Sequence, residues 1–172
     1  MPTYEVLLDE ALEQGLTVIE KYPFTSPRIR GLCCDDVIAL SEKIDTEAER
    51  RVVLCEELTH AAHSTGNILD DPHMEQRARA RSFDRLVGLG GLIRAFLAGC
   101  REAWEFAEML NVPEEFLAEL MANYRARYGT MTTVSTDQGV FALAFEPVFR
   151  VKRLVRGKRS HQQGKRKREE AI

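Results

Sequence analysis

Apolar and polar positions in the first quarter of the chain predict a helix, a turn and short strands. Residues 3–21 are interpreted as a helix, and the prolines within residues 23–27 indicate a turn after it. Short apolar runs over residues 31–40 predict strands. The run over residues 37–40 leads into the next helix, and an extended peptide is expected to pair with the edge of this strand through its main chain.

The second predicted helix has the clearest boundaries. Thr46 and Glu49 form a capping box, in which a hydroxyl and a carboxylate three residues apart satisfy the first free backbone amides. The helix is therefore expected to run from Glu47 to His63.

A third helix is predicted over residues 72–87. Asp71 has the character of an N-cap, and Pro72 suits the first helical position, where its missing amide hydrogen is not needed. The GLGG segment at residues 88–91 is expected to break the chain between two helices. A solvated face of the third helix is expected to carry four arginines, Arg77, Arg79, Arg81 and Arg85.

Residues 101–128 are interpreted as two helices joined at residues 111–113. Acidic side chains on the second of these helices would repel phosphate, so packing or partner docking is expected there rather than DNA recognition. Residues 131–144 alternate in polarity and predict a β-hairpin. Together these elements predict an α+β fold that is mostly helical. Four apolar residues of the two helices over residues 101–128 have the spacing of a helix-turn-helix core, namely Ala107, Leu110, Val112 and Phe116. The acidic residues on the second of these helices are Glu114, Glu115 and Glu119.

The composition indicates the number of domains and the cellular compartment that we expect for this chain. The chain of 172 residues is 44% hydrophobic and 30% charged, which is typical of one globular domain. No apolar run approaches the length of a membrane span and no signal peptide opens the chain, so a cytoplasmic protein without membrane contact is expected. The four cysteines lack a C-x-x-C spacing, which suits reduced thiols.

The C-terminal segment differs in charge from the rest of the chain. Residues 150–172 contain ten Lys or Arg and two Glu, a local charge of +8, which leaves −11 for the remainder because the whole chain carries −3. Such a composition predicts a folded domain over residues 1–148 and a basic, disordered tail over residues 149–172. The tail could associate with nucleic acid or improve solubility.

The candidate chemistry lies in the second helix. Its apolar run VVLCEELTHAA carries Glu56, Glu57 and His60, and carboxylates on an apolar helix face require pairing or a metal. At helical spacing Glu56, His60 and His63 share one stripe, with Glu57 beside it. The common zinc-protease signature is H-E-x-x-H, so a glutamate stands here in place of the first histidine. A further ligand must come from elsewhere in the chain.

The stretches EELTHAAHSTGNILDD and EQRARARSF resemble the ImmA/IrrE family of metallo-endopeptidases, which is common in phages and other mobile elements. The resemblance extends over about residues 3–129. It implies a zincin-like core with a small β-sheet and a metal-binding helix. By position it makes His60 and Glu75 metal ligands and Glu57 the catalytic base, with Glu56 at the first ligand position.

The resemblance implies Zn²⁺ as the cofactor. Because a second carboxylate replaces an imidazole, the site charge would be near zero, and the oxygen-rich ligand set would also accept Mn²⁺ or Fe²⁺. His63 is an alternative ligand, since H-x-x-H also places two imidazoles on one face.

The expected function is an endopeptidase in which Glu57 takes a proton from the attacking water and returns it to the leaving amine. The partner would be a protein substrate, which family analogy identifies as a helix-turn-helix repressor of a phage or mobile element. The alternative is a catalytically inactive anti-repressor, a binding module of the same fold. Taken without the resemblance, Glu56 and Glu57 are equally compatible with solvated or ion-paired helix positions. Nothing in the sequence sets the oligomeric state.

Overall fold

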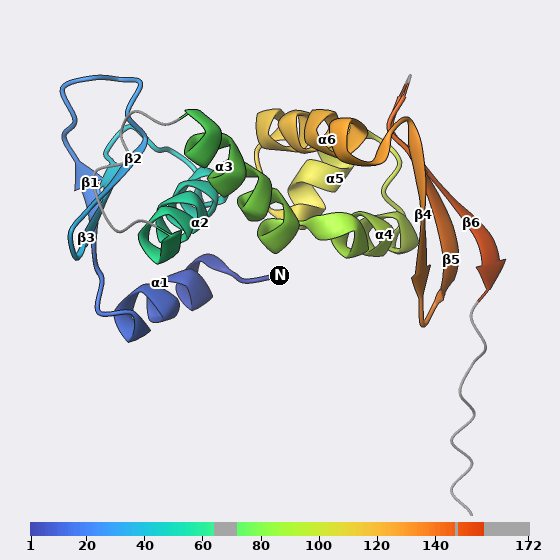
Figure 1. The fold of residues 1–172 in the computed structure, drawn as a ribbon, viewed down its shortest axis with the longest axis horizontal. Helices are drawn as coiled ribbons and strands as arrows, with labels where there is room; N and C mark the ends of the chain where they lie inside the picture. The colour runs from blue at the N-terminus through green and yellow to red at the C-terminus, as the bar shows by residue number, and fades with distance from the viewer. Residues whose placement is uncertain (64–71, 147, 157–172) are drawn as a thin grey trace, which may run out of the picture.

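The computed structural model describes residues 1–63, 72–146 and 148–156, without the side chains of residues 63, 72–75, 155 and 156. The fold is α+β and mostly helical, as predicted, with two three-stranded sheets. The sheets lie at opposite ends of the molecule, and helices occupy the space between them (Figure 1). No helix in these described ranges is long and apolar enough to cross a membrane.

The N-terminal segment forms a helix and a strand rather than one helix. Helix α1 (Tyr4–Glu13) ends where Gly15 adopts a φ of 76°, a left-handed conformation that glycine accepts without strain. Strand β1 (Thr17–Tyr22) follows, opened by three β-branched residues. The prediction of a helix over residues 3–21 is therefore wrong beyond Glu13, because β1 is stabilised by pairing with a strand twenty residues further along the chain.

The first sheet contains β2 (Gly31–Cys34) and β3 (Val37–Ser41), as the apolar runs predicted. The strand order is β1-β3-β2, with β3 parallel to β1 and antiparallel to β2. Both edges of β3 are thus paired, so the expectation that a peptide pairs with this strand is wrong. Among the described strands, β1 and β2 are the edges of this sheet.

Helix α2 (Glu47–His63) has the predicted boundaries. The Glu49 amide donates to Thr46 Oγ1 at 3.2 Å and the Thr46 amide donates to Glu49 Oε2 at 3.4 Å, which confirms the capping box. The helix packs on one face of the first sheet and buries Ile38 and Leu40 of β3 beneath it.

The helices α3 (Pro72–Leu86) and α4 (Gly88–Ala98) follow almost without interruption (Figure 1). The break lies at Val87 alone, so the GLGG segment forms the first turn of α4 instead of a linker. Gly91 is buried there, and a Cβ on it would meet Leu110 and Met1 side chains at 3.4 Å. These are ordinary van der Waals distances, so the packing does not require a glycine at this position.

Helices α5 (Ala103–Leu110) and α6 (Glu114–Tyr128) confirm the two predicted helices and their short connection. The predicted core residues of this pair are all buried, namely Ala107, Leu110, Val112 and Phe116.

The second sheet has the order β4-β5-β6. Strands β4 (Met131–Thr136) and β5 (Gly139–Ala144) form the predicted hairpin. Strand β6 (Arg150–Arg156) pairs antiparallel with β5, so the prediction of a disordered tail is wrong for these seven residues. Residues 157–172 lie outside the described part of the chain.

Candidate functional site

Glu56 lies in the second half of α2 and faces α3. Its side chain is 16% exposed, and its Oε1 atom forms an ion pair with the Arg79 guanidinium. The same guanidinium donates from Nε and Nη2 to Glu119 Oε2 of α6, at 3.0 and 2.7 Å. Arg79 therefore connects three helices and compensates the charge of Glu56.

Two aromatic rings hold Arg79 in this position. The guanidinium carbon lies 5.7 Å from the ring centroid of Phe83 and 5.3 Å from that of Phe116. Arg85 of the same helix pairs with Glu10 of α1. The predicted solvated arginine face is thus wrong for these two positions, because helices on either side supply carboxylates; Arg77 and Arg81 are exposed as expected.

Glu57 points in a different direction, toward β2. A Cβ built on Gly31 would lie 2.7 Å from Glu57 Oε1 and 2.5 Å from Val53 Cγ1. Burial raises the pKa of the Cys33 thiol, and the Glu57 carboxylate raises it further. The carboxylate of Glu57 is therefore packed beneath an edge strand of the first sheet.

His60 lies one turn after Glu56 and three residues after Glu57, so it occupies the helix stripe between their two directions. Its side chain is half-buried. The neighbouring Thr59 is buried and donates its hydroxyl to the Cys55 carbonyl oxygen at 2.7 Å, one turn earlier in the helix.

Two other predicted ligands fall at the limit of the described residues. His63 is the last residue of α2 and Glu75 lies in the first turn of α3, but their side chains lie outside the description. The proposed cap Asp71 lies outside it as well. Among the side chains that are described, no group of three His, Cys, Asp or Glu residues is close enough to hold a metal ion.

Two contacts between α2 and α3 show how the residues of the two helices lie opposite one another. Arg51 Nη2 donates to the Leu86 carbonyl oxygen at 3.2 Å, and Glu56 pairs with Arg79 further along α2. Positions thus rise along α2 as they fall along α3, so the two helices are antiparallel. One more turn in this register brings the turn of His60 opposite the turn of Glu75.

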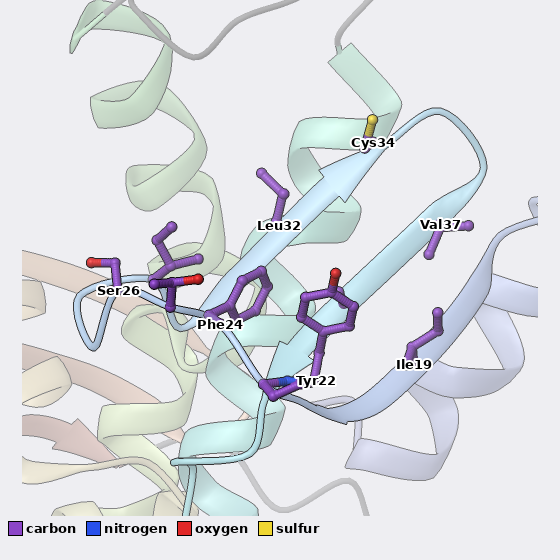
Figure 2. Close-up of a pocket in the computed structure, with 11 residues that line it drawn as sticks. Ile19, Tyr22, Phe24, Ser26, Leu32, Cys34 and Val37 are labelled. Atoms are coloured by element: carbon purple, nitrogen blue, oxygen red, sulfur yellow. The ribbon is translucent and has the colours of Figure 1, made fainter.

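An apolar pocket lies on the other face of the first sheet. It has a volume of about 500 Å³ and is lined by Leu32 and Cys34 of β2, Val37 of β3, and Tyr22 and Phe24 beside them (Figure 2). The last two rings contact each other with centroids 4.8 Å apart. Sequence reasoning missed this pocket, because only the strand order β1-β3-β2 brings the connection after β1 over this face.

Comparison of the chain with models of protein families, with curated proteins and with solved structures found no match.

Proposed function

We propose that this chain is a metal-dependent endopeptidase-like protein, similar to the ImmA/IrrE family and with a zincin-like core, that cleaves a protein partner. The proposal rests on one observation, which is that three side chains of α2 point in different directions. Glu57 lies against the edge strand β2, while Glu56 faces α3 and His60 lies between them. Metal-assisted peptide hydrolysis requires metal ligands with a general base close to them, and the three side chains lie within residues 56–60 of one helix.

The residues present are compatible with a metal ion. Arg79 contacts Oε1 of Glu56, and within the described residues Oε2 has no hydrogen-bond partner, so this oxygen can serve as a ligand. Arg79 would then be an outer partner that orients the carboxylate. His60 and Glu75 would complete the set, with His63 as the alternative. Zn²⁺, or Mn²⁺ or Fe²⁺ in its place, would polarise the carbonyl of the bond to be cleaved.

Glu57 would act as the general base. It would take a proton from the attacking water and donate it to the leaving amine. An extended peptide paired with the outer edge of β2 would run beside this carboxylate. Side chains of such a peptide alternate between the two faces of the sheet, so one set would face α2 and the other would face the apolar pocket.

A repressor of a phage or mobile element remains the proposed partner, on the strength of the resemblance. A binding module without catalysis is the second candidate, and one observation favours it. The ion pair with Arg79 compensates the charge of Glu56, so the fold does not depend on metal binding to satisfy this partly buried carboxylate.

Metal content decides between the two candidates. The chain should be purified without chelator or nickel affinity resin and analysed for metals, together with Glu56→Ala, His60→Ala and Glu75→Ala. We expect one metal ion per chain in the parent and its loss in all three variants. The exposed Glu108 is far along the chain in α5, so Glu108→Ala serves as the matched control and should keep the metal.

Catalysis is tested separately with Glu57→Gln. This variant should keep the metal but fail to cleave peptides that the parent cleaves in a mass-spectrometric screen of repressor-derived peptides. A parent chain without metal, even after Zn²⁺ or Mn²⁺ is supplied, would contradict the endopeptidase proposal and favour the binding module.

A further inference from the structure

The second sheet has an inner face that packs against helices and an outer face that points away from them. Phe141 and Leu143 of β5 are buried on the inner face, where the ring of Phe141 contacts that of Phe96 in α4. Ala142 and Ala144 alternate with these residues along β5, so they lie on the outer face. Their neighbours on that face in the strand register are Met131 and Thr133 of β4 and Arg150 and Lys152 of β6.

The outer face combines apolar surface with positive charge. Met131 is 59% exposed, and Leu154, which alternates with the inward-facing Arg153, is 50% exposed. Arg150 and Lys152 are exposed, and neither forms an ion pair with a carboxylate within the described part of the chain. The three strands contain no acidic residue. The outer face therefore suits a partner surface that is both apolar and acidic.

Helix α1 carries such a surface on its side away from the core. Tyr4, Leu7 and Ala11 are the buried residues of this helix. At 100° per residue, the exposed residues of the helix fall within an arc of about 120° on the opposite side. These exposed residues are Glu5, Val6, Asp9, Leu12 and Glu13.

The exposed face of α1 is apolar and acidic at the same time. Leu12 is 75% exposed, more than any other large apolar side chain in the described ranges. Asp9 and Glu13 form no ion pair with the described cations, whereas Glu10 at the border of this face pairs with Arg85. The exposed face of α1 thus has the charge opposite to that of the outer face of the second sheet.

The two surfaces also match in size. A helix of ten residues is about 15 Å long. Strands of six residues are about 20 Å long, and three of them side by side span about 10 Å between the outer strand axes. The exposed face of α1 can therefore lie along the outer face of the sheet over most of its length.

The two surfaces belong to different ends of the same chain. In Figure 1, α1 lies beneath the first sheet and the second sheet lies at the other end of the molecule, so the surfaces of one chain do not meet. A second copy can bring them together. Contact between two outer faces, or between two α1 faces, would oppose like charges, which weakens association. The favourable contact is therefore between α1 of one copy and the second sheet of another.

We propose that this chain associates head to tail, with the exposed face of α1 in one copy bound to the outer face of the second sheet in the next. Such a contact joins two different surfaces, so each copy keeps one free surface of each pair and further copies can add. The contact is small, which predicts weak association that depends on protein concentration. Salt weakens it further, because the paired charges lie at the surface.

The test is sedimentation velocity of the full chain over a wide range of concentrations, at low and at high salt. The average mass should rise with concentration at low salt and rise less at high salt. Arg150→Glu combined with Lys152→Glu removes the attraction on the sheet, and Asp9→Lys combined with Glu13→Lys removes it on α1. Each of these double variants alone should lose the concentration-dependent rise and remain a monomer.

Mixing the two double variants distinguishes this arrangement from a symmetric dimer. The sheet variant keeps an intact α1 and the α1 variant keeps an intact sheet, so one contact can form between them. An equimolar mixture should therefore give a dimer and no larger species, although each variant alone is a monomer.

Matched controls change the same charge at exposed positions elsewhere. Arg28→Glu combined with Lys43→Glu is the control for the sheet variant, and Glu108→Lys combined with Glu115→Lys is the control for the α1 variant. Both controls should associate like the parent, and thermal unfolding establishes that every variant is folded. The proposal is overturned if the parent stays monomeric at all concentrations, if either double variant associates like its control, or if the mixture remains monomeric.

Discussion

At the scale of single residues, Gly31 and Glu57 define the most specific feature of the candidate site. An alanine at position 31 would place its Cβ where Val53 Cγ1 and Glu57 Oε1 now lie. The missing side chain lets β2 pass directly over the carboxylate, so the proposed base is held next to an edge strand. A solvated helix glutamate would not need a glycine opposite it.

The pKa of the Cys33 thiol depends on the same carboxylate. Burial and the negative charge of Glu57 both raise the pKa of its thiol. We predict that Glu57→Gln lowers this pKa, so that at a fixed pH more thiolate is present and Cys33 is alkylated faster. The measurement is the alkylation rate against pH in a background where the exposed Cys34 and the half-buried Cys100 are replaced by serine.

The control for this prediction is Glu108→Gln, which removes a distant carboxylate. Equal rates in the two variants would mean that Glu57 does not face Cys33. Stability should follow the same linkage: because the folded pKa is raised, the contribution of Cys33 is fully present below the ordinary thiol pKa and is lost as pH rises through the folded value.

At the scale of elements, Arg79 determines how α2, α3 and α6 are held together. We predict that Arg79→Gln lowers the free energy of unfolding by about 1–3 kcal/mol, because Glu56 is 16% exposed and would lose its charge partner. Arg81→Gln on the same helix should change it by less than about 0.5 kcal/mol, since Arg81 is exposed. Urea unfolding measures both values.

A double-mutant cycle with Glu56→Gln isolates the pair itself. If the two substitutions are additive, Arg79 acts through Glu119 and the two aromatic rings instead, and its role as an outer partner of Glu56 is contradicted.

Elements specified by nearby residues could be predicted from the sequence, and elements specified by distant partners could not. The capping box fixes the start of α2 within four residues, so its boundaries were predicted correctly. Strand β1 depends on β3, and β6 depends on β5, so a helical spacing and a basic composition were misleading there. The positions of Glu56, Glu57 and His60 on one helix were predictable, whereas Arg79 and Gly31 reach them only through tertiary packing.

At the scale of the whole molecule, the two small sheets lie at opposite ends, with the helices between them (Figure 1). The first sheet and α2 carry the candidate site, at the end away from the second sheet. The two ends are connected through the helices between them.

Arg51 supplies such a connection. It is 2% exposed, and its guanidinium donates to the carbonyl oxygens of Pro2, Leu86, Leu110 and Asn111 at 2.7–3.2 Å. These four carbonyls belong to the N-terminus, the end of α3 and the end of α5. Burial lowers the pKa of this guanidinium, the nearby Glu47 carboxylate acts against that shift, and the carbonyl oxygens accept its hydrogen bonds.

We predict that Arg51→Met lowers the free energy of unfolding by about 3–5 kcal/mol, because several buried carbonyls lose their donor at once. It should also separate the unfolding of the two ends. The only tryptophan, Trp104, lies in α5, so its fluorescence follows that part of the molecule while far-ultraviolet circular dichroism follows all helices. The two transitions should coincide in the parent and diverge in the variant.

The exposed Arg94 of α4 provides the matched control, and Arg94→Met should leave both transitions coincident. Arg51→Lys should fall between the parent and Arg51→Met, since an ammonium keeps the charge but cannot reach carbonyls on three sides as a planar guanidinium does. Coincident transitions in Arg51→Met would show that packing among the helices, rather than this one side chain, couples the end of the molecule that contains α2 to the end that contains the second sheet.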